Sequence, residues 1–512
     1  MGTVDDIIAA MRAAVPPGQE QLDDASVRRL RDLTRTLVAA KAGAEDEHAR
    51  FVAIGHRGLC LPEERLNDWL RGATVVVTGG TGCIGSVLMA QIAERCPARL
   101  VSLSRGVTGE RPGIEGAEYR NADVRDRAAV AAVMEEVRPD VVFHVAAQRS
   151  PALAETEVHR TVTTNVLGTR NVVETAAEAG VPQVVCASTG KALRPYSPET
   201  YTASKRAAEW VASTAATSTS MLVSACRFTH VLDNSIIYER LLDWTADDEP
   251  VRLHGASIAF YVQSALESAQ LLLLAFAGAT RGEFRVHAIT DLGWPLNLID
   301  VALGVVGAKN SRSPVYVSGY DPGYEEVPFP GLYDPATAGD VSPLLNAFET
   351  AAAVGSPCPM VDAFRLDMAP DQVAPKLLAA LEAVCERTED PDTVRHALDD
   401  LSWSVLDATL GAAARPALTR SAKLVVQHEH AMTPVHRRVM EAIKGHANAD
   451  LARRARALLD NPADVAWSPG GCEGGPTGPP SQLQSGRDPV EHAVDPELEP
   501  LVPRQRRVGI DS

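Results

Sequence analysis

A glycine-rich stretch at residues 78–85, Thr-Gly-Gly-Thr-Gly-Cys-Ile-Gly, constrains the fold more than any other part of this sequence. The apolar run Thr74–Val77 precedes it and a helical pattern, Ser86–Glu94, follows it. Glycines at this spacing let the backbone turn sharply and leave room for a pyrophosphate, while the N–H groups at the helix start face the anion. The stretch therefore predicts a dinucleotide site rather than a tight turn without ligand. The expected cofactor contacts are Gly79, Thr81, Gly82, Cys83, Ile84 and Gly85.

The end of the next predicted strand, Leu100–Leu103, bears on the choice of cofactor. An NAD-specific site usually has an acidic residue there, whereas this chain has Ser104 and Arg105. A guanidinium can pair with a 2′-phosphate, so we expect NADP(H) rather than NAD(H), the alternative being that Arg105 is a solvated surface charge. Asp123 and Val124 follow the third predicted strand, near the expected adenine, although Asp123 is equally suited to cap the next helix.

A second group of candidate residues follows the predicted strand Val184–Ala187. Tyr201 and Lys205 are four residues apart, which places them on one face of a helix. A free tyrosine has a pKa of about 10, and a nearby lysine charge together with a nicotinamide would lower it. We expect Tyr201 to act as the catalytic base and Ser188 or Thr189 to hold the substrate oxygen. The alternative is a pair of surface residues on a helix.

Apolar runs alternate with helical stretches between residues 73 and 330. This predicts an α/β fold of the Rossmann type, with a doubly wound parallel sheet, a smaller C-terminal substrate lobe and helical N- and C-terminal extensions. The expected divisions are a helical extension at 1–70, the NADP-binding domain at 71–330, a linker or wrapped loop at 331–369, a helical region at 370–466 and a disordered tail at 467–512.

The charge balance excludes several classes of function. The chain has 49 basic and 66 acidic residues and a formal net charge of −17, which disfavours nucleic acid and anionic membranes. It lacks a long apolar run or a signal peptide, and its eight cysteines form no C-x-x-C pair. We therefore expect a cytoplasmic homo-oligomer with reduced thiols. The spacing of His428, His430 and His436 suits no single helical face, so no metal site is expected.

Residues 73 to 330 resemble an extended short-chain dehydrogenase/reductase, most closely the CapD-like polysaccharide-biosynthesis branch, which contains nucleotide-sugar dehydratases and epimerases. The matching segments are 78–85, 103–105, 142–147, 164–171, 188–192 and 227–228. The resemblance implies that Ala146 and Asn165 belong to the cofactor site. It implies transient oxidation of a sugar hydroxyl by NADP⁺, with Tyr201, Lys205 and Thr189 in the redox step and Lys191 in elimination or epimerisation.

Departures from the branch affect the expected substrate. Gly190 replaces an aspartate, and Ala259 and Asp321 stand where the branch has arginines that help to hold a diphosphate. Arg149 and Arg227 remain as candidate substrate-binding residues. The leading hypothesis is a dehydratase or epimerase acting on a sugar or nucleotide-sugar. The alternative is a net NADPH-dependent reductase or dehydrogenase of a small metabolite without a diphosphate, and a third possibility is a non-catalytic scaffold.

Overall fold

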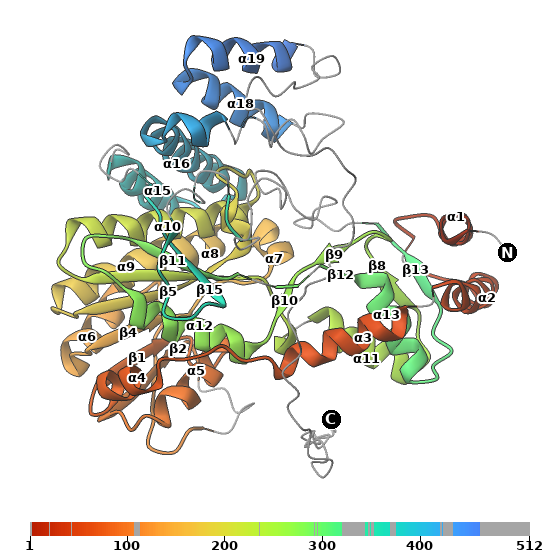
Figure 1. Cartoon of the computed structure of the whole chain (residues 1–512), viewed down its shortest axis with the longest axis horizontal. Helices are drawn as coiled ribbons and strands as arrows, with labels where there is room; N and C mark the ends of the chain where they lie inside the picture. Colours follow the sequence, from red (N-terminus) through yellow and green to blue (C-terminus); the bar gives the residue numbers. More distant parts are fainter. Residues whose placement is uncertain are drawn as a thin grey trace. The chain divides into compact units, whose positions relative to one another are not determined.

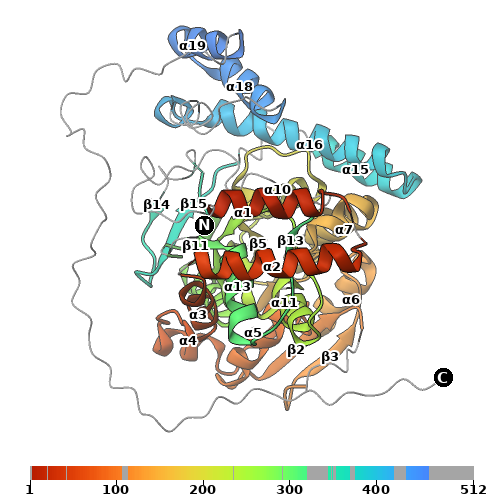
Figure 2. The same cartoon turned by 90° about the vertical axis from the view of Figure 1, so that its right-hand side faces the viewer.

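The computed structural model describes most of the chain between residues 3 and 460 (Figures 1 and 2). The gaps are residues 20, 42, 107–112, 235, 291, 294, 320–343, 347–348, 350–352, 369–374, 420–421 and 423–433. Asp321, the His428–His430 pair, the side chain of His436 and the predicted tail at 467–512 lie outside the described residues.

A nine-stranded sheet lies at the centre of the described chain, in the order β14-β15-β11-β6-β5-β4-β1-β2-β3 (Figure 1). The strands are β1 Thr74–Thr78, β2 Arg99–Ser104, β3 Glu118–Asn121, β4 Val141–His144, β5 Gln183–Thr189, β6 Leu222–Phe228, β11 Arg285–Ile289, β14 Ala353–Val354 and β15 Val361–Arg365. The strands from β11 through β6, β5, β4, β1 and β2 to β3 run parallel. Strand β15 pairs antiparallel with β11, and β14 pairs antiparallel with β15. The order reverses beside β1, where such sheets bind ligands. The predicted Rossmann-type sheet is confirmed.

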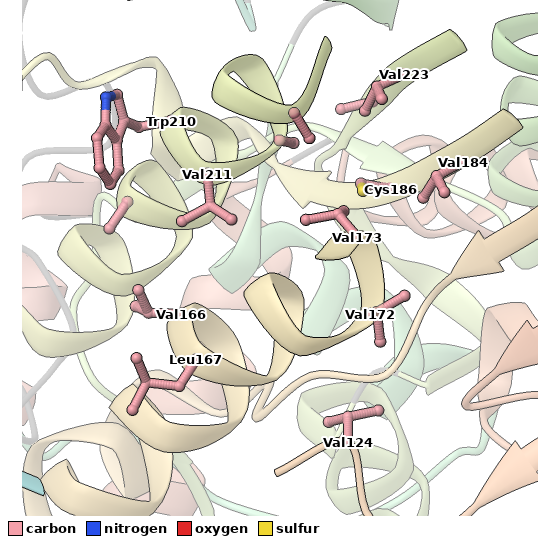
Figure 3. Close-up of a cluster of buried hydrophobic side chains, with 14 of the residues drawn as sticks. Val124, Val166, Leu167, Val172, Val173, Val184, Cys186, Trp210, Val211 and Val223 are labelled. Carbon is pink, nitrogen blue, oxygen red and sulfur yellow. The ribbon is translucent and has the colours of Figure 1, made fainter. Parts of the chain in front are cut away.

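Helices cover both faces of the sheet because each strand alternates apolar side chains between two buried clusters. One cluster joins Val76 and Val184 to α6 (Arg127–Val137), α9 (Gly168–Glu178) and α10 (Thr200–Ser218). The other joins Val75 and Val185 to α5 (Cys83–Ala93) and α12 (Ala265–Gly278). In Figure 3, Val184 and Cys186 on β5 face Val173 of the neighbouring helix. Packing on both faces of the sheet therefore fixes β1 and α5, and with them the glycine loop that joins the two.

The N-terminal helices form part of the core of the smaller lobe. They are α1 (Val4–Ala14), α2 (Asp24–Ala40), α3 (Ala44–Ala53) and η1 (Ile54–His56). The next helix, α4 (Glu63–Leu70), instead packs with α5 and α12 against the sheet. The lobe contains α11 (Ile236–Ala246), α13 (Leu298–Ala308) and the strand pairs β7–β10 (His230–Val231, Val262–Gln263), β9–β12 (Ala259–Phe260, Leu296–Asn297) and β8–β13 (Val251–Leu253, Val315–Val317). A Cβ on Gly304 of α13 would lie 2.4 Å from the Cβ of His48. Thr34 of α2 accepts a hydrogen bond from the backbone of Val315, at 2.8 Å. The extension is thus packed into the lobe rather than attached to its surface.

Two features near the C-terminus complete the described fold. Strands β14 and β15 lie inside the segment predicted to be a linker or wrapped loop, and they extend the central sheet. Pairing of β15 with β11, which runs from Ile289 opposite Val361 to Arg285 opposite Arg365, gives the strand its hydrogen bonds, and periodicity over five residues could not reveal this. Beyond it lie α15 (Pro375–Arg387), α16 (Pro391–Ala412), α18 (Pro434–His446) and α19 (Ala449–Asp460). None of the helices in this described part of the chain is long and apolar enough to cross a membrane.

Candidate active site

The glycine loop lies at the carboxyl end of β1 and is held by close backbone contacts. Gly79 has a φ of +73°, and a Cβ there would lie 2.8 Å from the backbone nitrogen of Ala146. A Cβ on Gly85 would lie 2.1 Å from the carbonyl oxygen of Gly79, so only glycine lets α5 approach the loop. Gly82 is the N-cap of α5 and supplies no side-chain hydrogen bond to the helix. Thr81, Cys83 and Ile84 are half-buried beside it. This arrangement fits a diphosphate at the helix N-terminus.

The ends of β2 and β3 bring together two cations and one acid. Arg105 is exposed directly after Ser104, the last residue of β2. Asp123 accepts hydrogen bonds from the Arg125 side chain at 2.7 and 3.0 Å. Burial opposes its ionisation, but Arg125 and the charge of Arg105 hold the pKa of Asp123 below its usual value. Asp126, not Asp123, caps α6, so the capping alternative for Asp123 is wrong.

Val124 and Asn165, two of the expected cofactor contacts, are buried and form contacts with other residues of the chain. The Val124 side chain is buried in the core, and its carbonyl accepts a hydrogen bond from Asn171 at 3.0 Å. Asn165 lies in a π-helical turn, η2 (Thr163–Leu167), and its amide bonds the backbone of Gln148 and, at 3.0 Å, the hydroxyl of Ser204. It thereby joins the loop after β4 to α10. Such π turns are frequent at functional sites.

Tyr201 and Lys205 lie on α10 beside the carboxyl end of β5. The Thr189 side chain and the charge of Arg149 both act on the Tyr201 phenol. Burial is nevertheless the largest effect and raises the pKa of Tyr201, although Thr189 and Arg149 oppose the shift. The protein's own groups therefore do not lower this pKa as the sequence predicted, since desolvation outweighs the nearby charges. Lys205 donates from Nζ to the carbonyl of Ala187 at 2.7 Å.

Burial disfavours the charged form of both candidate lysines, Lys205 and Lys191. Burial lowers the pKa of Lys205 to about 8, although Cys186 and Glu209 oppose the shift. Burial also lowers the pKa of Lys191, which senses the charges of Glu199, Arg194 and Glu155. A lysine with a lowered pKa exchanges a proton more readily near neutrality. Lys191 therefore has the electrostatic surroundings of a proton-transfer group.

Gly190, the position of the missing aspartate, is covered by an apolar side chain. A Cβ there would lie 2.6 Å from Cδ2 of Leu344 and 3.5 Å from the carbonyl oxygen of Phe228. Leu344 itself is 5% exposed. It begins a group of residues, described at positions 344–346 and 349, that we call the 344–349 segment. A longer side chain at position 190 would have to displace this segment.

Ser188 and Arg227 are drawn into a buried ionic network rather than exposed to a substrate. The Ser188 hydroxyl donates to Glu209 at 2.6 Å. Arg227 is fully buried and donates to Glu209 at 2.8 and 2.9 Å, to Glu349 at 2.6 and 2.8 Å, and to the Leu344 carbonyl at 2.9 Å. Arg206 bonds both carboxylates. The structure thus does not place Arg227 where it would bind a substrate, because two carboxylates already occupy its guanidinium.

Sequence reasoning missed three residues that shape this region. His144 bridges the hydroxyls of Thr78 at 2.8 Å and Thr169 at 3.0 Å, and burial, with the charge of Lys205, lowers its pKa to about 3, so it is neutral. Glu209 was detectable, since it is four residues after Lys205 on the same helix face. Glu349 gave no local signal. A cavity of about 10 Å³ behind Lys205 is large enough for one water at most.

Comparison with known proteins agrees with this geometry. The model of a family described as "Polysaccharide biosynthesis protein" matches residues 75–325. This segment, just under half of the chain, is similar to this CapD-like family. The capsular polysaccharide biosynthesis protein CapD of Staphylococcus aureus is 30% identical over 276 residues, which are 50% of this chain and 45% of CapD. A UDP-N-acetylglucosamine 4,6-dehydratase (inverting) of Campylobacter jejuni is 32% identical over 130 residues, 24% of this chain and 37% of the dehydratase.

A solved structure gives the same picture of the fold. Pen from Bacillus thuringiensis superposes with a TM-score of 0.50 at 21% identity, over 59% of this chain and 90% of that chain. At this identity the similarity shows the fold alone. The chain spans about half the length of the first curated relatives that it matches.

Proposed function

We propose that this CapD-like protein is an NADP-dependent enzyme that modifies a sugar or nucleotide-sugar by transient oxidation, as a dehydratase or epimerase. The observation that supports this best is the position of the Tyr201 phenol, which the Thr189 side chain at the carboxyl end of β5 influences and which lies on the same helix as Lys205. The glycine loop lies at the same edge of the sheet. The similarity to CapD and to a UDP-N-acetylglucosamine dehydratase supports a sugar nucleotide as substrate.

In the proposed mechanism the nicotinamide cofactor, when bound, supplies a hydride acceptor. The glycine loop and the N-terminus of α5 hold its diphosphate. Thr189 orients the substrate hydroxyl, Tyr201 takes its proton, and the Arg149 and Lys205 charges stabilise the phenolate. Lys191 then accepts the proton on the carbon next to the new ketone. Hydroxide leaving the neighbouring carbon would take up the Lys191 proton and depart as water, or Lys191 would return that proton to the carbon in inversion. A bound cofactor would then supply the hydride that reduces the ketone.

The preference for NADP within this proposal depends on Arg105. Its exposed guanidinium follows β2, and the neighbouring carboxylate of Asp123 is neutralised by Arg125. A 2′-phosphate would therefore meet net positive charge at this edge. The proposal also retains the predicted cytoplasmic location and homo-oligomeric state.

Two observations favour a second candidate, a net NADPH-dependent reductase of a substrate without a diphosphate. Gly190 provides no acid for elimination, and Leu344 covers it. Arg227 is fully paired with carboxylates and cannot hold a diphosphate in this arrangement. The two candidates differ in stoichiometry, because a dehydratase or epimerase recycles its cofactor and a reductase consumes it.

The deciding experiment incubates the purified chain with NADP⁺ and a panel of nucleotide-sugars beginning with UDP-sugars. Mass spectrometry detects loss of water, NMR detects inversion, and the absorbance of reduced nicotinamide detects net redox. Tyr201→Phe should lower turnover about 10²- to 10⁴-fold while NADP⁺ affinity stays unchanged. Tyr119→Phe on β3 is the matched control, since its hydroxyl bonds the backbone of Ile114 and no expected site residue. Full turnover by Tyr201→Phe would overturn the assignment of the base.

A further inference from the structure

Two free cysteines from distant parts of the chain meet at the edge of the core. Cys60 lies in the loop between η1 and α4, and Cys358 lies in the turn between β14 and β15. Their Sγ atoms are 2.9 Å apart although the residues are separated by 298 positions. A disulfide requires an S–S distance of about 2.05 Å, so the two sulfurs need to approach by only about 0.9 Å.

The backbone on both sides of the pair is held in place. The neighbouring Leu59 is buried, and its N–H donates to the Gln270 side chain of α12 at 2.7 Å. The carbonyl of Cys358 accepts a hydrogen bond from Val361 at 3.1 Å. Leu59, Cys358 and Val361 belong to the same buried cluster, and so does Leu344. The pair is therefore set by packing rather than by a chance approach of two surface loops.

The two thiols differ in a way that suits ordered oxidation. Cys60 is exposed, whereas Cys358 is fully buried. Burial, together with the hydrogen bond to Cys60, raises the pKa of Cys358, so this thiol stays protonated. An oxidant in solution reaches Cys60 first, and Cys358 is the only sulfur placed within 3 Å of it by the described contacts.

We propose that Cys60 and Cys358 form a reversible, peroxide-driven disulfide that links the N-terminal extension to the β14–β15 hairpin. The deprotonated Cys60 sulfur attacks hydrogen peroxide, so that an S–O bond forms, the O–O bond breaks and hydroxide leaves, taking up a proton to become water. The Cys358 sulfur then attacks the sulfenic sulfur. The S–S bond forms, the S–O bond breaks, and the second water leaves with the thiol proton. Two thiols and one peroxide thus give one disulfide and two waters.

This link has a consequence for the catalytic side of the sheet. The hairpin that carries Cys358 begins at Ala353, a few positions after the 344–349 segment, in which Leu344 contacts Gly190 and Glu349 pairs with Arg227. Oxidation would connect the β14–β15 hairpin covalently to the loop before α4. It would thereby limit how far the 344–349 segment can move from the carboxyl ends of β5 and β6. The proposal does not depend on the proposed function, since the chemistry requires no sugar substrate or nicotinamide.

The test treats the reduced full-length chain with hydrogen peroxide after removal of reductant. The intact mass should fall by about 2 Da, the thiols that titrate after denaturation should fall from eight to six, and dithiothreitol should restore both. Peptide mapping should recover a Cys60–Cys358 cross-link. Cys60→Ser and Cys358→Ser should each abolish it, whereas Cys96→Ser, which removes another exposed thiol, should leave it intact.

Three results would overturn the proposal. The first is that eight thiols remain after peroxide treatment. The second is sulfinic or sulfonic acid at Cys60 without any cross-link. The third is a cross-link from Cys60 to a different cysteine, such as Cys472. Because none of these readouts uses catalysis, failure here is distinct from failure of the proposed enzyme activity.

Discussion

Glu349 should be worth several kcal/mol to this fold, although it lies far outside the glycine-loop and Tyr201 motifs. Its carboxylate accepts from Arg227 at 2.6 and 2.8 Å, from Arg206 at 3.0 Å and from the backbone of Asn346 at 3.0 Å. Burial opposes its ionisation, but Arg227 and Arg206 hold the pKa of Glu349 below its usual value. The two arginines and two glutamates balance in charge, so Glu349→Gln leaves one buried positive charge without compensation. Such a loss costs about 3–5 kcal/mol.

Urea unfolding followed by far-UV circular dichroism measures this loss. The matched control is Glu283→Gln, because Glu283 also accepts from an arginine, Arg285, at 2.8 Å, but with 30% of its side chain exposed. An exposed pair is worth about 0.2–1 kcal/mol, so the control should be nearly silent. Equal losses in the two variants would refute the reasoning, since they would mean that Glu349 is not desolvated. If Glu349→Gln does not fold, Glu349→Asp, which keeps the charge, should restore folding.

Three further predictions concern the cofactor, a buried lysine and the covered glycine. Arg105→Ala should weaken NADPH binding by about 10- to 100-fold and NADH binding hardly at all in a fluorescence titration. Arg120→Ala, which removes a half-buried arginine on β3, is the control, and equal losses of the two cofactors in Arg105→Ala would contradict the prediction. Burial lowers the pKa of Lys205 to about 8, so above that pH the folded state binds fewer protons than the unfolded state. The free energy of unfolding of the native chain should therefore rise by about 3 kcal/mol relative to that of Lys205→Met between pH 8 and 10.5, and a difference that does not change with pH would show that Lys205 is solvated. Gly190→Asp should cost about 1–3 kcal/mol, and adding Leu344→Ala should return part of that loss, whereas additive losses would separate the two residues.

The features that sequence reasoning predicted are those whose physical cause is local. The loop between β1 and α5 needs glycines because its own backbone atoms approach within a few residues of one another, as the Gly79–Gly85 contact shows. The joint placement of Tyr201 and Lys205 follows from helix geometry alone. Both motifs can therefore be predicted from the local sequence alone.

The features that were missed depend on partners far away in the sequence. Arg227 was expected to bind substrate because it remains where other arginines of the branch are lost, yet its carboxylate partner Glu349 is 122 residues later. Strand β15 is too short for periodicity to identify, and it exists because β11 offers it an edge. The packing of α3 on α13 likewise joins residues about 250 positions apart, and no local pattern encodes such a contact.

In the sequence, Gly190 and Arg227 are separate features: an aspartate of the branch is lost at position 190, and an arginine is retained at position 227. In the structure they share one cause, because the 344–349 segment contacts both. Leu344 fills the space above Gly190, its carbonyl accepts from Arg227, and Glu349 neutralises that arginine. An aspartate at position 190 would collide with the side chain that begins the segment, and without the segment Arg227 would be left with an unbalanced charge environment. Glycine at position 190 therefore allows the 344–349 segment to pack against the strand ends. The loss of the acid at position 190 and the loss of Arg227 as a substrate-binding residue thus have the same structural cause.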